Sequence, residues 1–219
     1  MRMALLLKEL RECSLYAGLA LLAQIHFLGE GMDLPLIPVL MSGRGLEIPL
    51  LNVNRETMFA GTAILAAIVI GLHQTMWESW RQTTLLLLHR PMDRSQIFLG
   101  KMLAGSLLVF GTSALPLLVY CLWAAMPGTH SSPFYWNMTL PWWKDVAIAL
   151  VCYLGAFLTG LRTAAWFGSR TWPLITAIVV SLAWKFAPVW LLFNVAGFAG
   201  LMACLTVLIL DTAERREFP

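Results

Sequence analysis

Residues 171–210 read TWPLITAIVVSLAWKFAPVWLLFNVAGFAGLMACLTVLIL, and Lys185 is the single charged side chain in this stretch. As one α-helix, these roughly 40 residues would extend about 60 Å, twice the ~30 Å hydrocarbon core of a bilayer. The stretch must therefore fold back on itself. Pro188 disfavours helical geometry at the residue before it and Lys185 favours water, so residues 185–188 form the predicted hinge between two membrane spans.

The composition of the whole chain points to the same environment. The 219 residues are 59% hydrophobic and 12% charged, with a mean hydropathy of +0.73. Soluble domains average about 45–50% apolar and ~25% charged residues. One core cannot enclose this excess of apolar side chains, so the composition excludes a soluble enzyme and a disordered protein. A nucleic-acid binder is excluded as well, because the basic residues behind the net charge of +3 are dispersed between apolar runs.

Apolar runs separated by polar or proline-rich segments predict the architecture. The predicted spans cover about 13–29, 58–77, 97–125, 146–161, 171–185 and 188–210. At about 20 residues per span they use nearly the whole chain. We therefore expect an all-α integral membrane protein, with six transmembrane helices in one domain over residues 13–210 and a polar tail over 211–219.

Residues 1–12 have the pattern of an amphipathic helix. The apolar side chains of Met3, Leu6, Leu7 and Leu10 share one helical face, and the opposite face carries the charged side chains of Lys8, Glu9, Arg11 and Glu12. Such a helix is suited to lying along the membrane surface before the first span. A signal peptide is the alternative interpretation, but these four charges interrupt the apolar region that it requires.

The distribution of basic residues predicts the orientation. With six spans, the N-terminus, residues 78–96, residues 162–170 and the tail share one side of the membrane. Together with Lys101, that side holds eleven of the fifteen lysines and arginines, and the other side holds four. Cytoplasmic loops carry this excess, so we expect both termini in the cytoplasm.

The motifs of membrane enzymes are missing from the sequence. It contains no HExxH metalloprotease motif and no GxxxxGK[ST] nucleotide-binding loop, so we expect no catalytic residues, no metal site and no directly bound cofactor. The four cysteines lie in or beside apolar runs without a CxxC pair, which suggests packing roles. His73 and Asn194 lie within predicted spans and are candidates for a substrate path, with interhelical hydrogen bonding as the alternative. Acidic residues and arginine are expected to be absent from mid-membrane, which argues against an ion-coupled pump.

The segment after the second predicted span is the most informative one. Residues 78–91 read ESWRQTTLLLLHRP, which predicts a short helix at the cytoplasmic face that places Leu87 and Leu88 on its apolar side and ends at Pro91. An apolar helix in this position is suited to docking a soluble partner. A plain interfacial connector is the alternative.

At these residues the chain resembles the permease subunits of ABC-2-type ATP-driven exporters. The positions that match the family pattern are Glu78, Thr83, Leu86, Leu87, Pro91, Arg94, Gly100 and Lys101. The opening Lys8, Glu9, Arg11 and Glu12 are similar to the connector helix of that family. Gln82, Thr84 and Leu85 depart from the pattern, at positions where the family has a glycine, a leucine and an acidic residue.

The resemblance implies a function and a set of partners. The chain would be the transmembrane subunit of an exporter in the plasma membrane, which is the inner membrane of a bacterium. It would pair with a second permease subunit in the lipid bilayer and with a separate ATPase subunit that binds ATP and magnesium. The implied coupling residues are Glu78, Arg81, Thr83, Leu87, Leu88, Pro91, Arg94 and Lys101. A haem-exporter-type permease of cytochrome c maturation and a non-transporting membrane scaffold are the alternatives.

Overall fold

The computed structural model describes residues 2–32, 48, 50–77, 93–129, 133–163, 166–187 and 191–215, which are helical almost throughout. The chain begins with α1, Arg2–Gly31, and α2, Val53–Leu72, which continues into a π-helical turn, η2, His73–Trp77. Next come α5, Arg94–Ala125, the 3₁₀ turn η3, Trp136–Thr139, and α6, Leu140–Leu161. A second π-helical turn, η4, Trp166–Arg170, precedes α7, Trp172–Lys185, and α8, Leu191–Arg215.

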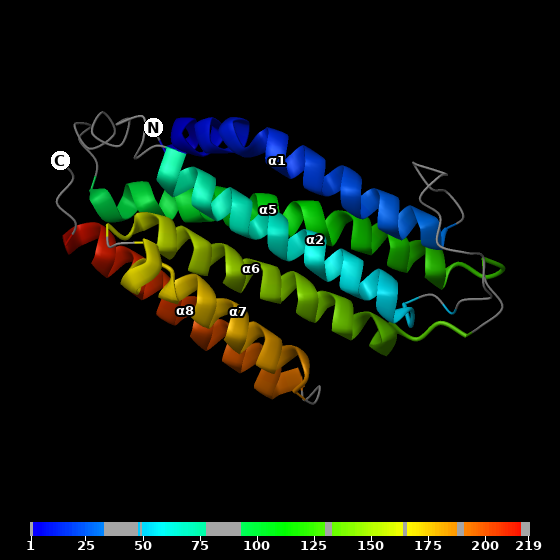
Figure 1. Cartoon of the computed structure of the whole chain (residues 1–219). Helices are drawn as coiled ribbons and strands as arrows, with labels where there is room; N and C mark the ends of the chain where they lie inside the picture. The colour runs from blue at the N-terminus through cyan, green and yellow to red at the C-terminus, as the bar shows by residue number, and fades with distance from the viewer. Residues whose placement is uncertain are drawn as a thin grey trace.

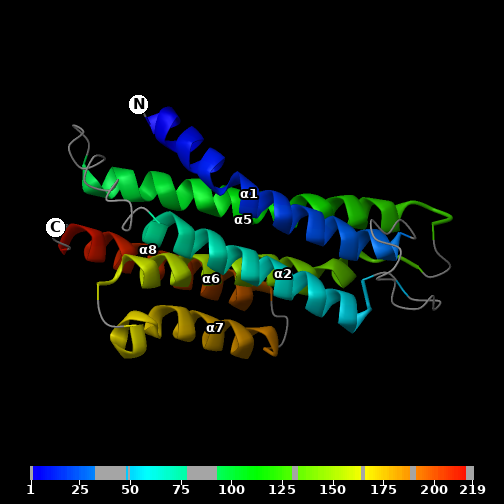
Figure 2. The ribbon, with the colours of Figure 1, turned by 45° about the horizontal axis from the view of Figure 1, so that its top comes forward.

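These long helices lie side by side in one elongated bundle, and successive helices run in opposite directions (Figure 1). α1 begins and α8 ends at the same end of the bundle, which we call the terminal end; the other is the distal end. α6 lies in the centre and contacts α2, α5, α7 and α8. Figure 2 shows α7 on one outer side of the bundle and α1 on the opposite side, where α1 packs against α2 and α5.

Four helical segments of the described residues are long and apolar enough to cross a membrane. They are Val53–Trp77, Arg94–Ala125, Trp136–Leu161 and Asn194–Arg215. Each overlaps one of the predicted spans, so the all-helical fold and its suitability for a membrane are confirmed. α7 ends at Lys185 and α8 begins at Leu191, so the chain reverses at the predicted hinge.

The predicted boundary between a surface helix over 1–12 and a first span over 13–29 does not appear as a break. α1 is continuous from Arg2 to Gly31. Glu9, Cys13, Ala17 and Ala20 form one buried stripe across that boundary at helical spacing. Both segments present the same face to the bundle, and therefore they join into one helix, whose first turns bend away from the remainder (Figure 2). In the predicted tail, α8 likewise continues to Arg215, whose Nε lies 2.7 Å from Asp211 Oδ1.

Glycines let the central helix approach its neighbours closely. Every residue of α6 from Val151 to Leu161 is buried. A Cβ added to Gly71 of α2 would lie 3.0 Å from the Ala156 methyl group, and one added to Gly155 would lie 2.6 Å from the Ala177 methyl group of α7. Small residues at helix crossings are the typical means of packing helices within a membrane.

Candidate functional site

A buried polar network joins four helical elements near the terminal end of the bundle. It consists of Glu9 from α1, Gln74 from η2, Lys101 from α5 and Tyr153 from α6, each at most 2% exposed. The Tyr153 hydroxyl donates to Gln74 Oε1 at 2.7 Å, and Gln74 Nε2 donates to Glu9 Oε2 at 3.2 Å. Gln74 Nε2 also lies 3.3 Å from the Lys101 carbonyl oxygen. We call this set the four-residue network.

The network encloses a charged pair. Lys101 Nζ lies 3.7 Å from Glu9 Oε1, and the half-exposed Lys8 places its Nζ 3.5 Å from the same oxygen. Removing two charges from water is costly, so such a pair adds little net stability, but removing only one partner costs about 3–5 kcal/mol. The pair therefore fixes how α1 lies against α5 more than it stabilises the fold.

Two local features place the Gln74 side chain in the network. The hydrogen bonds of the π-helical turn His73–Trp77 span five residues instead of the four of an α-helix, which redirects the side chains that follow α2. Gly105 of α5 then leaves room for the contact, because a Cβ there would overlap the Tyr153 hydroxyl and lie 2.5 Å from Gln74 Oε1. Thr75 of the same turn donates to the Gly71 carbonyl at 3.0 Å, which satisfies its buried hydroxyl.

His73 begins this π-helical turn and contacts α1. Its Nδ1 lies 3.9 Å from Cys13 Sγ, and its ring centroid lies 4.8 Å from that of Tyr16. On the other side it stacks on Trp77 at 5.7 Å. The contact with Cys13 of α1 agrees with the alternative of interhelical hydrogen bonding, and a role of His73 in a substrate path stays a prediction.

A second charged cluster ties α2, α6 and α7 together toward the distal end. Lys185 Nζ lies 3.0 Å from both carboxylate oxygens of Asp145 and 3.1 Å from Glu56 Oε1. Asp145 is 1% exposed, whereas Glu56 is 21% and Lys185 28% exposed. Lys144 donates to the carbonyl oxygen of Ala187 at 3.0 Å, just beyond the C-terminus of α7. The hinge lysine, expected to face water, is therefore held mainly by two carboxylates.

The four-residue network and the charged cluster around Lys185 form two polar levels, which are separated along the bundle by about the thickness of a membrane. Glu56 and Gln74 are 18 residues apart on α2 and η2, which corresponds to an axial rise of about 27 Å. This is close to the ~30 Å hydrocarbon core. Buried acidic residues thus do occur in this bundle, at Glu9 and Asp145, but each lies near one border of the apolar layer and is paired with a lysine.

The residues expected to contact a partner fall into three groups. Glu78, Arg81, Thr83, Leu87, Leu88 and Pro91 lie outside the described residues. Arg94, Arg11 and Glu12 are exposed at the terminal end, with Lys8 partly exposed beside them. Glu9 and Lys101 are buried in the four-residue network, so in this structure they face helices of the same chain and not a docked protein.

Asn194 has a structural partner. Its Oδ1 accepts a hydrogen bond from Trp184 Nε1 of α7, which links the two helices of the predicted hairpin close to their turn. The Trp184 ring also packs on Phe198 at 4.9 Å and covers Gly197. Trp142 of α6 is fully buried and donates from Nε1 to the Leu50 carbonyl at 3.0 Å.

Gln74, Tyr153, Glu56 and Asp145 were not predicted as site residues. Gln74 carried a usable signal, because it is an amide next to His73 within an apolar run. Tyr153 carried none, since a tyrosine in an apolar helix is compatible with lipid exposure as well as with a buried hydrogen bond.

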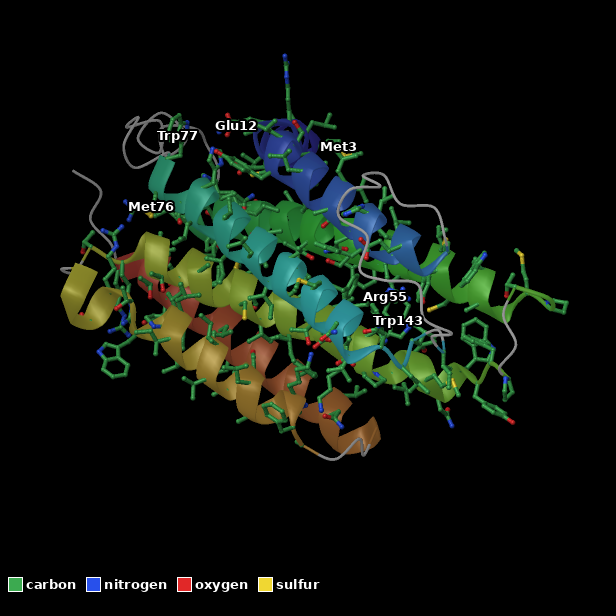
Figure 3. All side chains as sticks on the ribbon, turned by 45° about the vertical axis from the view of Figure 1, so that its right-hand side comes forward. Met3, Glu12, Arg55, Met76, Trp77 and Trp143 are labelled. Carbon is green, nitrogen blue, oxygen red and sulfur yellow. The ribbon has the colours of Figure 1, made fainter. Side chains whose placement is uncertain are left out.

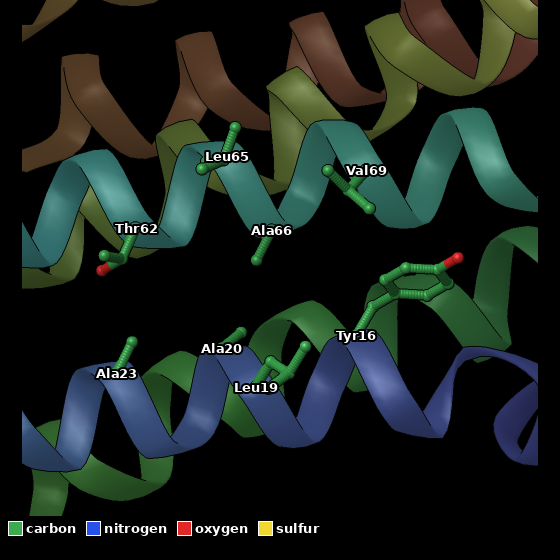
Figure 4. Close-up of a pocket in the computed structure, with 8 residues that line it drawn as sticks. All are labelled: Tyr16, Leu19, Ala20, Ala23, Thr62, Leu65, Ala66 and Val69. Atoms are coloured by element: carbon green, nitrogen blue, oxygen red, sulfur yellow. The ribbon is translucent and has the colours of Figure 1, made fainter.

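Two apolar grooves flank α1. One lies between α1 and α2, where residues such as Ala20, Ala23 and Ala66 line about 260 Å³ (Figure 4). The other lies between α1 and α5, around Leu28 and Pro116, with about 490 Å³. Over the residues that the structure describes, no three His, Cys, Asp or Glu side chains are grouped as a metal site would require. The side chains that line the two grooves are apolar apart from Tyr16 and Thr62.

Comparison with known proteins adds no assignment. No protein-family model matches the chain, and neither does any curated protein or solved structure.

Proposed function

We propose that this chain is the transmembrane subunit of an ATP-driven exporter of the ABC-2 type, with both termini in the cytoplasm. The observation that carries the proposal is that the four-residue network contains residues from both sides of the segment 78–91 in the sequence. Gln74 precedes that segment and Lys101 follows it, and both contact Glu9 of α1. A force applied to the segment by a docked ATPase would pass through these contacts to α1, and through Tyr153 to the central helix α6.

The proposal includes six membrane crossings. Besides the four apolar segments, α1 rises about 31 Å from Glu9 to Glu30, which is sufficient for the ~30 Å core. α7 rises about 20 Å from Trp172 to Lys185 and follows η4, whose backbone is non-helical at Gly168, so the proposed fifth crossing needs residues of both elements. Six antiparallel crossings also explain why α1 begins and α8 ends at the same end of the bundle (Figure 1).

The centre of the bundle supports a path between subunits rather than through one chain. α6 occupies the central position and is buried along its whole second half. In that half, the Tyr153 hydroxyl is bonded to Gln74 and the Thr159 hydroxyl accepts from the Leu174 N–H of α7, so both are engaged by other helical elements of the same chain. A substrate would therefore pass between this chain and a second permease subunit, which an exporter of this type requires.

Co-purification of the full chain from native membranes tests the proposal. We expect an ATPase with a nucleotide-binding loop to be retained, and addition of ATP to change the protease sensitivity of the complex. Leu87→Asp combined with Pro91→Ala, and separately Arg94→Glu, should reduce the retained ATPase by about tenfold. Arg215→Glu is the matched control, because Arg215 is an 80% exposed arginine at the same end of the bundle.

The opposite results would favour the membrane-scaffold alternative. If the intact chain retains no ATPase and ATP leaves the protease pattern unchanged, the exporter proposal is wrong. If the ATPase is retained equally by all variants, residues 78–94 are not the docking segment.

A further inference from the structure

We infer that the groove between α1 and α2 binds one acyl chain of a membrane lipid from the side of the membrane on which α1 begins. The α1 wall is formed by Tyr16, Leu19, Ala20 and Ala23, and the α2 wall by Thr62, Leu65, Ala66 and Val69 (Figure 4). All eight residues lie within the described parts of the two helices.

The depth of the groove in the membrane determines what surrounds it. On α2 the groove extends from Thr62 to Val69, between the charged level at Glu56 and the polar level at Gln74. Its centre near Leu65 is about 13.5 Å from each level, which is the middle of the apolar layer. Hydrocarbon rather than water therefore has access to the groove.

The lining has almost no polar group to offer a ligand. The Thr62 hydroxyl donates back to the carbonyl oxygens of Met58 and Phe59, both at 2.9 Å. Tyr16 directs its hydroxyl away from the end formed by Ala20 and Ala23 (Figure 4). An occupant must consequently be apolar over its whole length within the groove, because an unpaired polar group in hydrocarbon is costly.

The shape of the groove favours a narrow occupant. Ala20, Ala23 and Ala66 form its floor, and the rims carry Leu19 and Leu65, which are 60% and 63% exposed. A helix with side chains is about 10–12 Å wide and would meet these rims before it reached the floor. A single polymethylene chain fits between them and regains dispersion contacts that an empty groove loses.

Aromatic side chains at one end of the groove indicate the side from which the lipid comes. Tyr16 packs on His73, and His73 stacks on Trp77, which is 42% exposed. Rings of this kind are typical of the level of lipid headgroups. The rise from Trp77 to Leu65 is about 18 Å, close to the ~15 Å hydrocarbon depth of one leaflet. At the α1–α5 groove the lining ends at Met32, next to residues outside the described part, so that groove carries no inference.

Photocrosslinking of the full chain in phospholipid nanodiscs tests the inference. A phospholipid with a diazirine near the end of one acyl chain should label peptides that contain residues 16–23 and 62–69. Replacement of both Ala23 and Ala66 by leucine fills the groove and should reduce this labelling by about tenfold. Ala199→Leu, on the exposed face of α8, is the matched control and should leave it unchanged.

Two further measurements separate the filling of the groove from unfolding of the variant, and one side of the membrane from the other. The thermal midpoint of each variant is compared with that of the parent, and Ala66→Leu alone replaces the double variant if the latter is unfolded. A headgroup-linked diazirine should label residues 73–77, whereas labelling of residues 53–58 would place the lipid on the other side and contradict the inference.

Other occupants give distinct results. Equal labelling of α7, α8 and the groove, or unchanged labelling after the groove is filled, would overturn the inference. A disulfide between two copies of an Ala23→Cys variant would show that a second copy covers the groove instead. None of these outcomes depends on ATPase association, so they leave the proposed function to its own test.

Discussion

Tyr153 and Gln74, 79 residues apart in the sequence, share a hydrogen bond of 2.7 Å inside the bundle. The bond connects the central helix α6 to the π-helical turn that precedes residues 78–91. Gln74 in turn donates to Glu9 of α1, so one amide contacts three separate helical elements. Figure 3 shows Met76 and Trp77 of this turn at the same side of the molecule as Glu12 and Met3 of α1.

Tyr153→Phe should lower the free energy of unfolding by about 1–3 kcal/mol, because it leaves the buried Gln74 oxygen without its donor. Thermal unfolding in detergent measures the change. Tyr135→Phe is the control, because Tyr135 is 60% exposed and its substitution should have little effect. Equal stability of the two variants would contradict the role assigned to this hydroxyl.

Lys101→Met should destabilise the protein by about 3–5 kcal/mol, since the buried carboxylate of Glu9 would keep its charge and lose its buried lysine partner. Combining it with Glu9→Gln should recover part of this loss, because the uncompensated charge is then removed. A double-mutant cycle of unfolding measurements gives the coupling. Strictly additive losses would mean that the two side chains do not interact.

In the charged cluster around Lys185, the two carboxylates should contribute differently to the free energy of unfolding. Asp145→Asn should be more destabilising than Glu56→Gln, because Asp145 is almost fully buried and Glu56 is partly exposed. We expect about 3 kcal/mol for the first and at most about 1 kcal/mol for the second. Increasing salt should reduce only the contribution of Glu56, so unfolding at two ionic strengths separates the two. If Glu56→Gln were the more destabilising substitution, the main ion pair of Lys185 would be with Glu56 of α2.

Gly105→Ala should destabilise the bundle by about 2 kcal/mol or more, since the new methyl group overlaps the Tyr153 hydroxyl. Gly200→Ala is the matched control, because nothing lies within 4 Å of a Cβ at that position. The control should be neutral or stabilising by up to about 1 kcal/mol from helix propensity. Comparable losses in both variants would show that backbone conformation, and not the contact with Tyr153, decides the effect.

The pattern of residues was sufficient to predict those features of the fold that depend on consecutive residues. The apolar stretch over 171–210 exceeds the bilayer thickness, and Pro188 with Lys185 indicated where it reverses, as the separation of α7 and α8 confirms. The remaining apolar runs predicted α2, α5 and α6 for the same reason: length and composition alone decide whether a helix is suited to a membrane.

The pattern of residues was insufficient to predict the burial of a side chain whose surroundings are formed by another helix. Glu9 and Lys101 were expected to contact a partner protein, yet both are buried, and so is Trp142. For Glu9 and Trp142 the hydrogen-bond partner is far away in the sequence: Gln74 for Glu9, and Leu50 for Trp142. Helical periodicity indicates which residues share a face but not which neighbour covers that face.

The sequence by itself therefore determined that the chain is helical, where the apolar cores of α2, α5 and α6 lie and that it is suited to a membrane, because these properties follow from the hydropathy of consecutive residues. Only the tertiary structure decided that α1 is one continuous helix, that α6 is central and that Glu9 pairs with Lys101. Those features depend on distances between helices, which are set by the glycines at their crossings and by buried polar groups that must find partners across the bundle.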